Sequence, residues 1–121
     1  MALAGTVPCN KALDALENIA PSVNYLGFVS LHSASPSTTG ANEATGGGYA
    51  RQAETWNAAA SNAKTNLGAL SFTTTGATAY THFGTWSLVT AGVYGLGGAL
   101  TSSVTAVTIT VAAGALSLGL T

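Results

Sequence analysis

The chain has 121 residues, of which 47% are hydrophobic and only 6% are charged, with a formal net charge of −1. This length suits one domain, and the hydrophobic share is enough to build a core. The three basic residues, Lys11, Arg51 and Lys64, are scattered along the sequence, which excludes the clustered cations that nucleic-acid binding requires.

The charges are concentrated in the first half of the chain. Every Asp, Glu, Lys and Arg lies between Lys11 and Lys64, and residues 65–121 have none. A surface this poor in charge has little repulsion to resist association, so we expect an oligomer or a member of a larger assembly. The apolar runs end before the roughly 18 residues of a membrane-spanning helix, and the start of the chain lacks the features of a secretory signal. The lone Cys9 excludes a disulfide within the chain.

Residues 10–20, "NKALDALENIA", are the one segment with helical periodicity. Asn10 is a suitable N-cap, and Leu13 and Leu16 fall on one face of the expected helix. Pro21 ends it. A helix of about eleven residues is too short to be stable alone, so we expect its leucine face to pack on the rest of the fold.

Beyond Pro21 the hydrophobic pattern alternates with a period of two, which is typical of strands. The expected strands span residues 24–32, 49–56, 68–76, 79–89 and 93–103, followed by a terminal hairpin over 106–121. Both faces of the first strand carry bulky side chains, which predicts burial on two sides. Residues 57–66 fit either a turn or a helical stub. The pattern predicts a single mainly β domain over residues 1–121, an antiparallel, jelly-roll-like β-sandwich with one short N-terminal helix.

The sequence offers no clear catalytic, metal or cofactor site. It has no G-x-S-x-G pattern, and its only Asp, Asp14, lies on the outer face of the expected helix. Of the four carboxylates, Glu43 and Glu54 are the only plausible pair for glycoside hydrolysis. A metal site would require His32, His82 and carboxylates to converge, and their spacing does not favour this. We therefore expect a protein that is not an enzyme and has no metal or cofactor.

Four aromatic residues, Tyr49, Trp56, Tyr80 and Trp86, have two possible roles. Packing in the core or in an interface is the more common role of such side chains. The alternative is a sugar-stacking platform, which would suit an adhesin.

The loop over residues 33–48 contains Glu43 and a triple glycine, and Arg51 follows it. The glycines precede neither a helix nor a Lys-Ser/Thr pair, so they do not predict a phosphate-binding loop. If the loop doubles back, Glu43 meets Arg51, and an exposed pair of this kind contributes about 0–1 kcal/mol. Two interpretations are open: a tie within the chain, or docking of the loop onto a neighbouring subunit, for which the arginine fork is well suited.

The block "LHSASPSTTGANEATGGGYARQ" (31–52) resembles a pattern in small virion proteins of tailed bacteriophages, which are described as tail fibre, minor tail or head decoration proteins. The similarity extends from "LDAL" (13–16) through "THFGTWS" (81–87) and "GALTSS" (98–103) to "AAGALSLGLT" (112–121) in the same order. Two positions depart from the pattern. Ser33 replaces a threonine, and Ser87 replaces an acidic residue.

The resemblance implies a non-enzymatic structural component of the virion. A single compact domain without a coiled coil or fibre repeat favours a capsid decoration (cement) protein, on the capsid surface rather than the tail. We expect such a protein to be a homotrimer that binds the major capsid protein or other virion proteins. The alternative is a minor tail or tail-fibre-associated protein that contacts a host-surface glycan. The expected interface residues are Asn42, Glu43, Tyr49, Arg51, His82 and Trp86.

Overall fold

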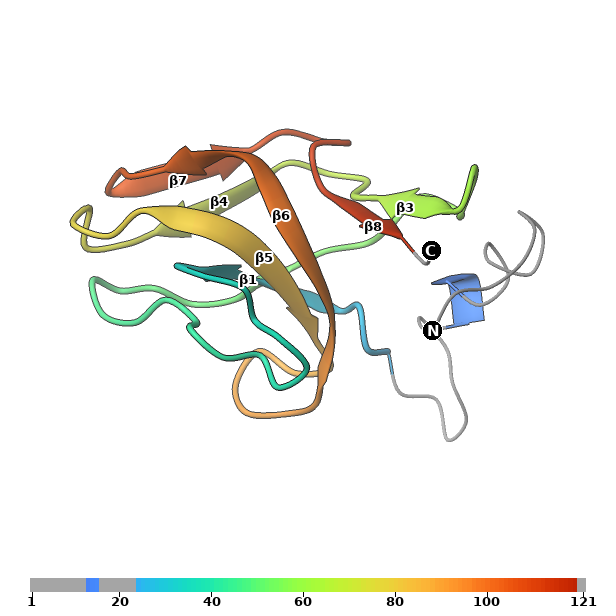
Figure 1. Ribbon diagram of the computed structural model, residues 1–121, viewed down its shortest axis with the longest axis horizontal. Coiled ribbons are helices and arrows are strands. Elements are labelled where there is room, and N and C mark those ends of the chain that lie inside the picture. The colour runs from blue at the N-terminus through green and yellow to red at the C-terminus, as the bar shows by residue number, and fades with distance from the viewer. Residues whose placement is uncertain (1–12, 16–23, 120–121) are drawn as a thin grey trace.

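A computed structural model of the chain describes residues 13–15 and 24–119. Within these residues the chain is mainly β, with antiparallel pairing throughout (Figure 1). The strands are β1 (Phe28–His32), β2 (Gln52–Ala53), β3 (Ala63–Thr65), β4 (Leu70–Thr73), β5 (Tyr80–Trp86), β6 (Tyr94–Val104), β7 (Thr108–Val111) and β8 (Ser117–Gly119). The prediction of a mainly β, antiparallel, sandwich-like fold is confirmed.

Two layers enclose the core. One is a four-stranded sheet in the order β2-β1-β5-β6, and the other consists of two short ribbons, β4-β7 and β3-β8 (Figure 1). Alternate residues of the central strands face inward, so that Val29, Leu31 and Phe83 join Phe72 and Ile109 in one buried cluster. The burial pattern of β4 and β7 alternates buried with exposed, because their other face is open to solvent.

The predicted terminal hairpin is wrong, although both of its strands are present. β7 pairs with β4, and β8 pairs with β3. The reason is Asn66, which is fully buried between the two ribbons. Its Nδ2 donates to the carbonyl oxygens of Gly68 (2.8 Å) and Ala112 (3.1 Å), and its Oδ1 accepts from the Leu116 amide (2.9 Å). The side chain thus replaces ladder bonds where the ribbon is interrupted. Residues 112–115 still form a turn, in which the Ala115 amide donates to the Ala112 carbonyl (3.1 Å), but the strands on its two sides pair with β4 and β3 instead of with each other.

Other element boundaries also shift. The first strand begins at Phe28 rather than at residue 24, and the expected strand 49–56 is reduced to Gln52–Ala53. Of the two alternatives for the segment 57–66, the structure bears out the turn, which lies between Ala60 and Ala63, and β3 follows directly from it. β5 ends at Trp86, three residues earlier than expected, because the chain turns away there into an exposed loop.

Most of the predicted helix over residues 10–20 lies outside the described residues. Residues 13–15 are helical, and Leu13 is fully buried, as its place on the leucine face predicts. Asp14 forms an ion pair with Lys64, with 2.6 Å between Oδ1 and Nζ, and also accepts from the Ala59 amide. The Lys64 side chain is 1% exposed, so this pair attaches the helical turn to β3.

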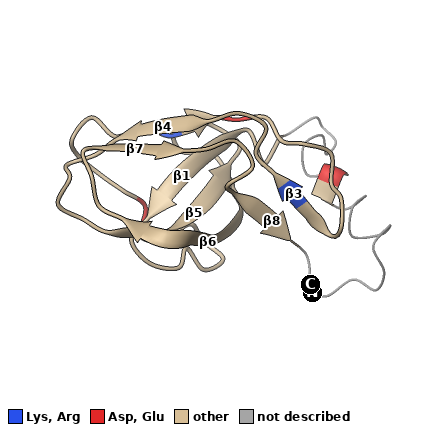
Figure 2. Cartoon of the chain, turned by 90° about the horizontal axis from the view of Figure 1, so that it is seen from above, with Lys and Arg blue, Asp and Glu red and all other residues tan. Residues whose placement is uncertain are grey.

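Charges are absent from the strands that follow β4. Figure 2 shows β5, β6, β7 and β8 without a coloured residue, in agreement with the sequence. Among the described residues, no helix is long and apolar enough to cross a membrane. The solvent-facing side chains of β6 and β7 are instead mostly Thr, Ser, Ala and Gly.

We predict that Asn66→Ala destabilises the fold strongly. The change leaves one buried amide and two carbonyl oxygens without their side-chain partner, and each loss of this kind costs about 1–3 kcal/mol. Urea unfolding should therefore show a loss of about 3 kcal/mol in the free energy of unfolding. Ser71→Ala, at an exposed position of β4, is the control and should change stability by less than about 0.5 kcal/mol. Equal stability of the two variants would contradict the role given to Asn66.

Candidate assembly surface

The loop over residues 33–48 folds back across the outer face of the four-stranded sheet, the face turned away from β4 and β7. Two backbone bonds hold it there: the Ser33 amide donates to the Asn42 carbonyl (3.1 Å), and the Ala44 amide donates to the Leu31 carbonyl (2.9 Å). These bonds place Glu43 opposite His32 in a single antiparallel bridge. The predicted doubling back of the loop is therefore confirmed.

The triple glycine makes the turn that ends this loop. Gly46, Gly47 and Gly48 all have positive φ, at 77°, 64° and 81°, a conformation that other residues adopt only with strain. A side chain at Gly47 would lie 2.6 Å from the backbone of Thr74. The glycines thus serve backbone geometry and close packing against the β4–β5 connection.

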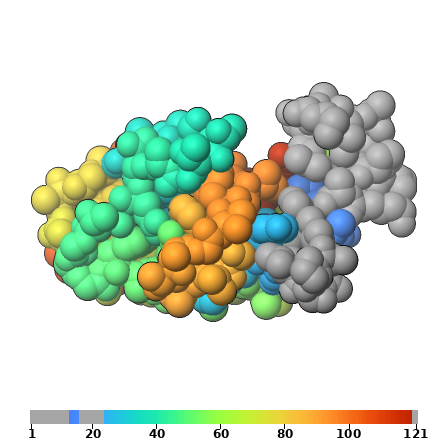
Figure 3. Space-filling view, turned by 90° about the horizontal axis from the view of Figure 1, so that it is seen from below, coloured from blue at the N-terminus to red at the C-terminus, as the bar shows by residue number. Residues whose placement is uncertain are grey.

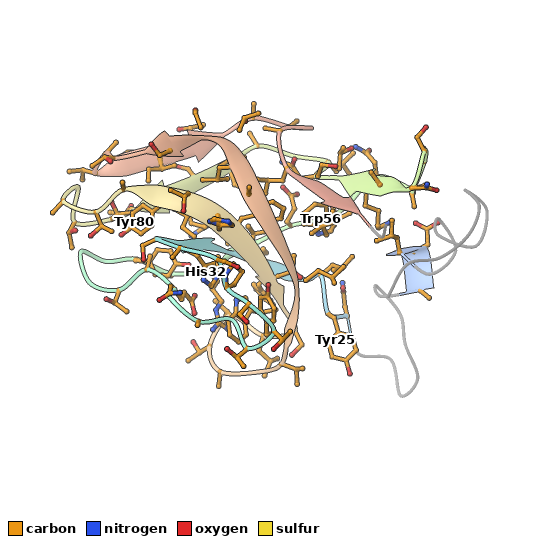
Figure 4. The ribbon with its side chains drawn as sticks, in the orientation of Figure 1. Tyr25, His32, Trp56 and Tyr80 are labelled. Atoms are coloured by element: carbon orange, nitrogen blue, oxygen red, sulfur yellow. The ribbon has the colours of Figure 1, made fainter. Side chains whose placement is uncertain are left out.

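Beneath the loop lies a chain of buried polar contacts that begins at Trp86. The Trp86 Nε1 donates to Ser30 Oγ (2.8 Å), and Ser30 Oγ lies 2.7 Å from His32 Nε2. His32 Nδ1 lies 2.7 Å from the carbonyl oxygen of Ala41 in the loop. Since a carbonyl only accepts, Nδ1 carries the proton and Nε2 accepts from the serine hydroxyl. Burial lowers the pKa of His32, which favours this neutral form, and Figure 4 shows the ring on the loop side of β1.

Two glycines make room for these side chains. A methyl group at Gly84 would lie 2.8 Å from His32 Nε2 and 2.9 Å from Ser30 Oγ. One at Gly40 would lie 2.5 Å from the ring of Trp86. The outer face of the sheet is therefore filled by polar and aromatic groups, which confirms the prediction that β1 is buried on two sides.

The Arg51 guanidinium joins three separate segments of the chain. Its Nε and Nη2 each lie 2.8 Å from a carboxylate oxygen of Glu43, a two-pronged ion pair. Its Nη1 donates to the carbonyl oxygens of Leu88 (3.0 Å) and Ala91 (2.7 Å), and its Cζ lies 3.6 Å from the centre of a Trp86 ring. The side chains of Arg51 and Glu43 are 9% and 21% exposed. The tie within the chain is thus the interpretation that the structure bears out, and the pair is more buried than expected.

Tyr49 completes the setting of the Glu43 carboxylate. Its hydroxyl donates to Glu43 Oε2 (3.1 Å) and accepts from the Leu31 amide (3.0 Å). Burial raises the pKa of the Tyr49 phenol, so it remains a proton donor at any physiological pH. The carboxylate is therefore fixed from both the arginine and the tyrosine side.

The loop between β5 and β6, residues 87–93, is closed by its own bonds. The Ser87 amide donates to the Val93 carbonyl (3.0 Å), and the Val93 amide donates to Ser87 Oγ (2.9 Å). Ser87, where the sequence departs from the resembled pattern, provides in its hydroxyl group the acceptor for the Val93 amide. Ala91 has a φ of 55°, which is unusual for a residue with a side chain. The Arg51 guanidinium donates a hydrogen bond to the Ala91 carbonyl and so fixes the backbone at this position.

Three large aliphatic residues project from this loop. Leu88 is 55% exposed, Val89 is 49% exposed and Val93 is 55% exposed. We call these three residues the β5–β6 surface. Figure 3 shows the orange segment that contains them beside the cyan and green atoms of the 33–48 loop. Because three exposed aliphatic side chains lie on one short loop, this surface is a candidate for contact with another macromolecule.

Four of the six predicted interface residues converge beneath this surface: Glu43, Tyr49, Arg51 and Trp86. Asn42 lies elsewhere in the loop and donates to the Ser35 carbonyl, and His82 lies on β5 beside a separate groove. Their role in an interface stays a prediction. Sequence reasoning missed the exposed aliphatic residues themselves, because Leu88 and Val89 continue the alternation of β5. The glycine at position 92 and the Ser87 that follows Trp86 were the available signals of a loop.

The structure corrects the sugar-stacking alternative for three of its four aromatic residues. Trp56, Tyr80 and Trp86 are 6%, 2% and 9% exposed, and Figure 4 shows the first and second inside the fold. Trp56 donates to the Leu26 carbonyl (2.8 Å). Their packing role is confirmed. Across residues 13–15 and 24–119, no three His, Cys, Asp or Glu side chains come together as metal ligands would.

The described residues thus form an antiparallel β fold with an exposed aliphatic loop. Residues 6–119 match the protein family described as podophage GP4 fiber I protein gp80. The match covers nearly the whole chain, so the chain belongs to this family, and the resemblance to tailed-bacteriophage virion proteins is confirmed. A comparison with curated proteins gives no match.

We predict a measurable coupling between Arg51 and Glu43. Arg51→Ala should lower the free energy of unfolding by about 3 kcal/mol, because it leaves a largely buried carboxylate without its partner. In a double-mutant cycle with Glu43→Ala, urea unfolding should give a coupling energy of about 1–3 kcal/mol. A cycle of Arg51→Ala with Ser71→Ala serves as control and should give a value near zero. Additive effects of Arg51→Ala and Glu43→Ala would show that the pair contributes nothing of its own.

We also predict that His32 makes the fold sensitive to acid. Its folded-state pKa is lowered, so below about pH 6.5 the unfolded chain binds a proton that the folded chain does not. The stability that the neutral ring provides is complete above that pH and is lost as the pH falls through the folded-state pKa. Urea unfolding between pH 8 and pH 5 should therefore show a steeper loss for the wild type than for His32→Gln, which keeps a donor and an acceptor but does not titrate. Parallel pH profiles would disprove this role.

Proposed function

We propose that this protein is a non-enzymatic structural component of the phage tail, a fibre-associated module that assembles through the β5–β6 surface. The family to which the chain belongs is described as a fibre protein, which favours the tail-fibre alternative over capsid decoration. The observation that carries the proposal is the group of exposed aliphatic residues, Leu88, Val89 and Val93, on a loop that internal bonds hold in place. Such a surface is suited to binding and offers no chemistry for catalysis.

The fixed shape of the loop supports this proposal. A flexible loop must be ordered when it binds, at a cost of about 0.5–1.5 kcal/mol for each side chain immobilised. Here Arg51 and Ser87 already bond the loop backbone at both ends and at Ala91. A partner therefore gains the burial of three apolar side chains with little further ordering.

The partner expected at this surface is uncharged. Arg51 is the cation that contacts this loop, and its donors are already engaged by Glu43 and by two loop carbonyls. The chain itself provides such a partner, since residues 65–121 have no formal charge. We therefore propose that copies of this chain contact one another through the β5–β6 surface, and that a trimer is the assembled form.

Capsid decoration remains the second candidate. It is favoured by one feature: the described residues form a compact β unit without the coiled coil or repeat of an elongated fibre. The two candidates differ in copy number, which quantitative gel densitometry of purified particles measures directly. A tail fibre component is present in few copies per particle, whereas a decoration protein covers the shell. A copy number in the hundreds would overturn the fibre proposal.

We predict that Leu88→Ser impairs assembly without unfolding the protein. The matched control is Leu67→Ser, because Leu67 is 56% exposed and lies between β3 and β4, outside the loop. Both changes should alter the free energy of unfolding by less than about 0.5 kcal/mol. Light scattering coupled to size-exclusion chromatography should show dissociation only for Leu88→Ser, and particles should incorporate only Leu67→Ser normally. Wild-type assembly of Leu88→Ser would sink the proposal.

A further inference from the structure

A groove lies on the outer face of the sheet, at the edge formed by β6. It has a volume of about 330 Å³ and runs between the start of the 33–48 loop and the first half of β6. Its lining residues are Ser35, Pro36, Ser37, Thr38, His82, Tyr94, Gly95, Leu96, Gly97 and Gly98. None of them carries a formal charge, and none belongs to the β5–β6 surface.

Several polar groups in this groove are not used by the fold. His82 Nδ1 lies 2.8 Å from the Thr81 hydroxyl, while its Nε2 has no hydrogen bond within residues 13–15 and 24–119. The hydroxyl groups of Tyr94 and Thr38 also bond to nothing in this part of the chain, although Tyr94 is half-buried. The groove therefore offers both hydrogen-bond donors and acceptors that a ligand can reach.

The wall of the groove is shaped by close packing around Gly97. A methyl group there would lie 2.7 Å from the Phe83 carbonyl oxygen and 2.8 Å from the ring of Pro36, and it would also meet the Tyr94 hydroxyl. The Tyr94 ring in turn packs edge-on against Trp86, with 5.3 Å between ring centres. Bare backbone and a fixed aromatic ring thus line one side, and the hydroxyl groups of the loop line the other.

We propose that this groove binds an uncharged saccharide. A phosphate or carboxylate ligand requires a cation, and the groove has none. An apolar ligand would bury the imidazole and hydroxyl groups without partners, which is costly. A neutral sugar needs no cation and leaves no polar group without a partner. Its hydroxyl groups can pair with His82, Tyr94 and Thr38, while its ring carbons contact the aromatic and proline surfaces. The volume lies at the lower end of the range of about 300–1,000 Å³ found for small-molecule sites, which suits one or two sugar rings.

This site differs from the aromatic platform considered from the sequence. Of the four aromatic residues of that platform, none lines the groove. The saccharide proposal also goes beyond the assembly function, since the groove and the β5–β6 surface share no residue. The two can therefore fail independently.

The test is a titration of the whole ¹⁵N-labelled protein with neutral trisaccharides: maltotriose, cellotriose and tri-N-acetylchitotriose. We expect at least one of them to shift the amide resonances of residues 35–38 and 94–98, with a dissociation constant of about 1 mM. Tyr94→Phe, which removes only a hydroxyl group, should weaken binding about 2- to 10-fold. His82→Ala should weaken it at least as much.

A matched pair of variants separates the groove from the rest of the surface. Thr38→Val and Thr101→Val make the same change at two exposed threonines, one in the groove and one further along β6. Only Thr38→Val should weaken sugar binding, while both should assemble like the wild type. If none of the three sugars shifts these resonances, or if His82→Ala binds as well as the wild type, the saccharide site is refuted. If Leu88→Ser nevertheless dissociates the assembly as predicted, the assembly proposal would still stand.

Discussion

One guanidinium group connects three segments of this molecule on the outer side of the four-stranded sheet. Arg51 is the only arginine of the chain, and it connects the 33–48 loop through Glu43, the sheet through the Trp86 ring, and the β5–β6 loop through two carbonyl oxygens. A lysine could not replace it, because an ammonium group lacks the planar fork that meets a carboxylate and two carbonyls in fixed directions. Its low exposure strengthens these contacts relative to those of a surface pair.

The two faces of the four-stranded sheet are buried by different means. The inner face packs apolar side chains, such as Val29, Leu31 and Phe83, against the β4-β7 ribbon. The outer face is closed by a loop, and a loop brings backbone carbonyls that need partners. Ser30 and His32 provide them by linking Trp86 to the Ala41 carbonyl. This polar layer explains why a buried histidine is retained in a strand that is otherwise hydrophobic.

The sequence predicts the parts of this fold that depend on neighbours along the chain, and fails where distant residues decide. Alternation located β1, β4, β5 and β6, because a half-buried strand imposes its own period of two. It could not show that β7 pairs with β4, since that choice depends on Asn66 filling the interruption between two ribbons. The Glu43–Arg51 contact was predictable because the loop that joins them is short. The contacts of Arg51 with Leu88 and Ala91 were not predictable, because nothing in the residues between them indicates that these two parts of the chain lie close together in space.

The same limit explains why the exposed aliphatic residues were missed. Periodicity marks Leu88 and Val89 as hydrophobic but does not say whether another part of the chain covers them. No other described residue covers them, and Arg51, the cation that the described residues place beside this loop, is turned inward. For the assembly that we propose at this surface, charge complementarity is therefore not available, and specificity would have to come from shape. The shape of this loop depends on the bonds that Ser87 and Arg51 make to its backbone, so in the proposed assembly these two residues matter as much as the side chains that a partner would touch.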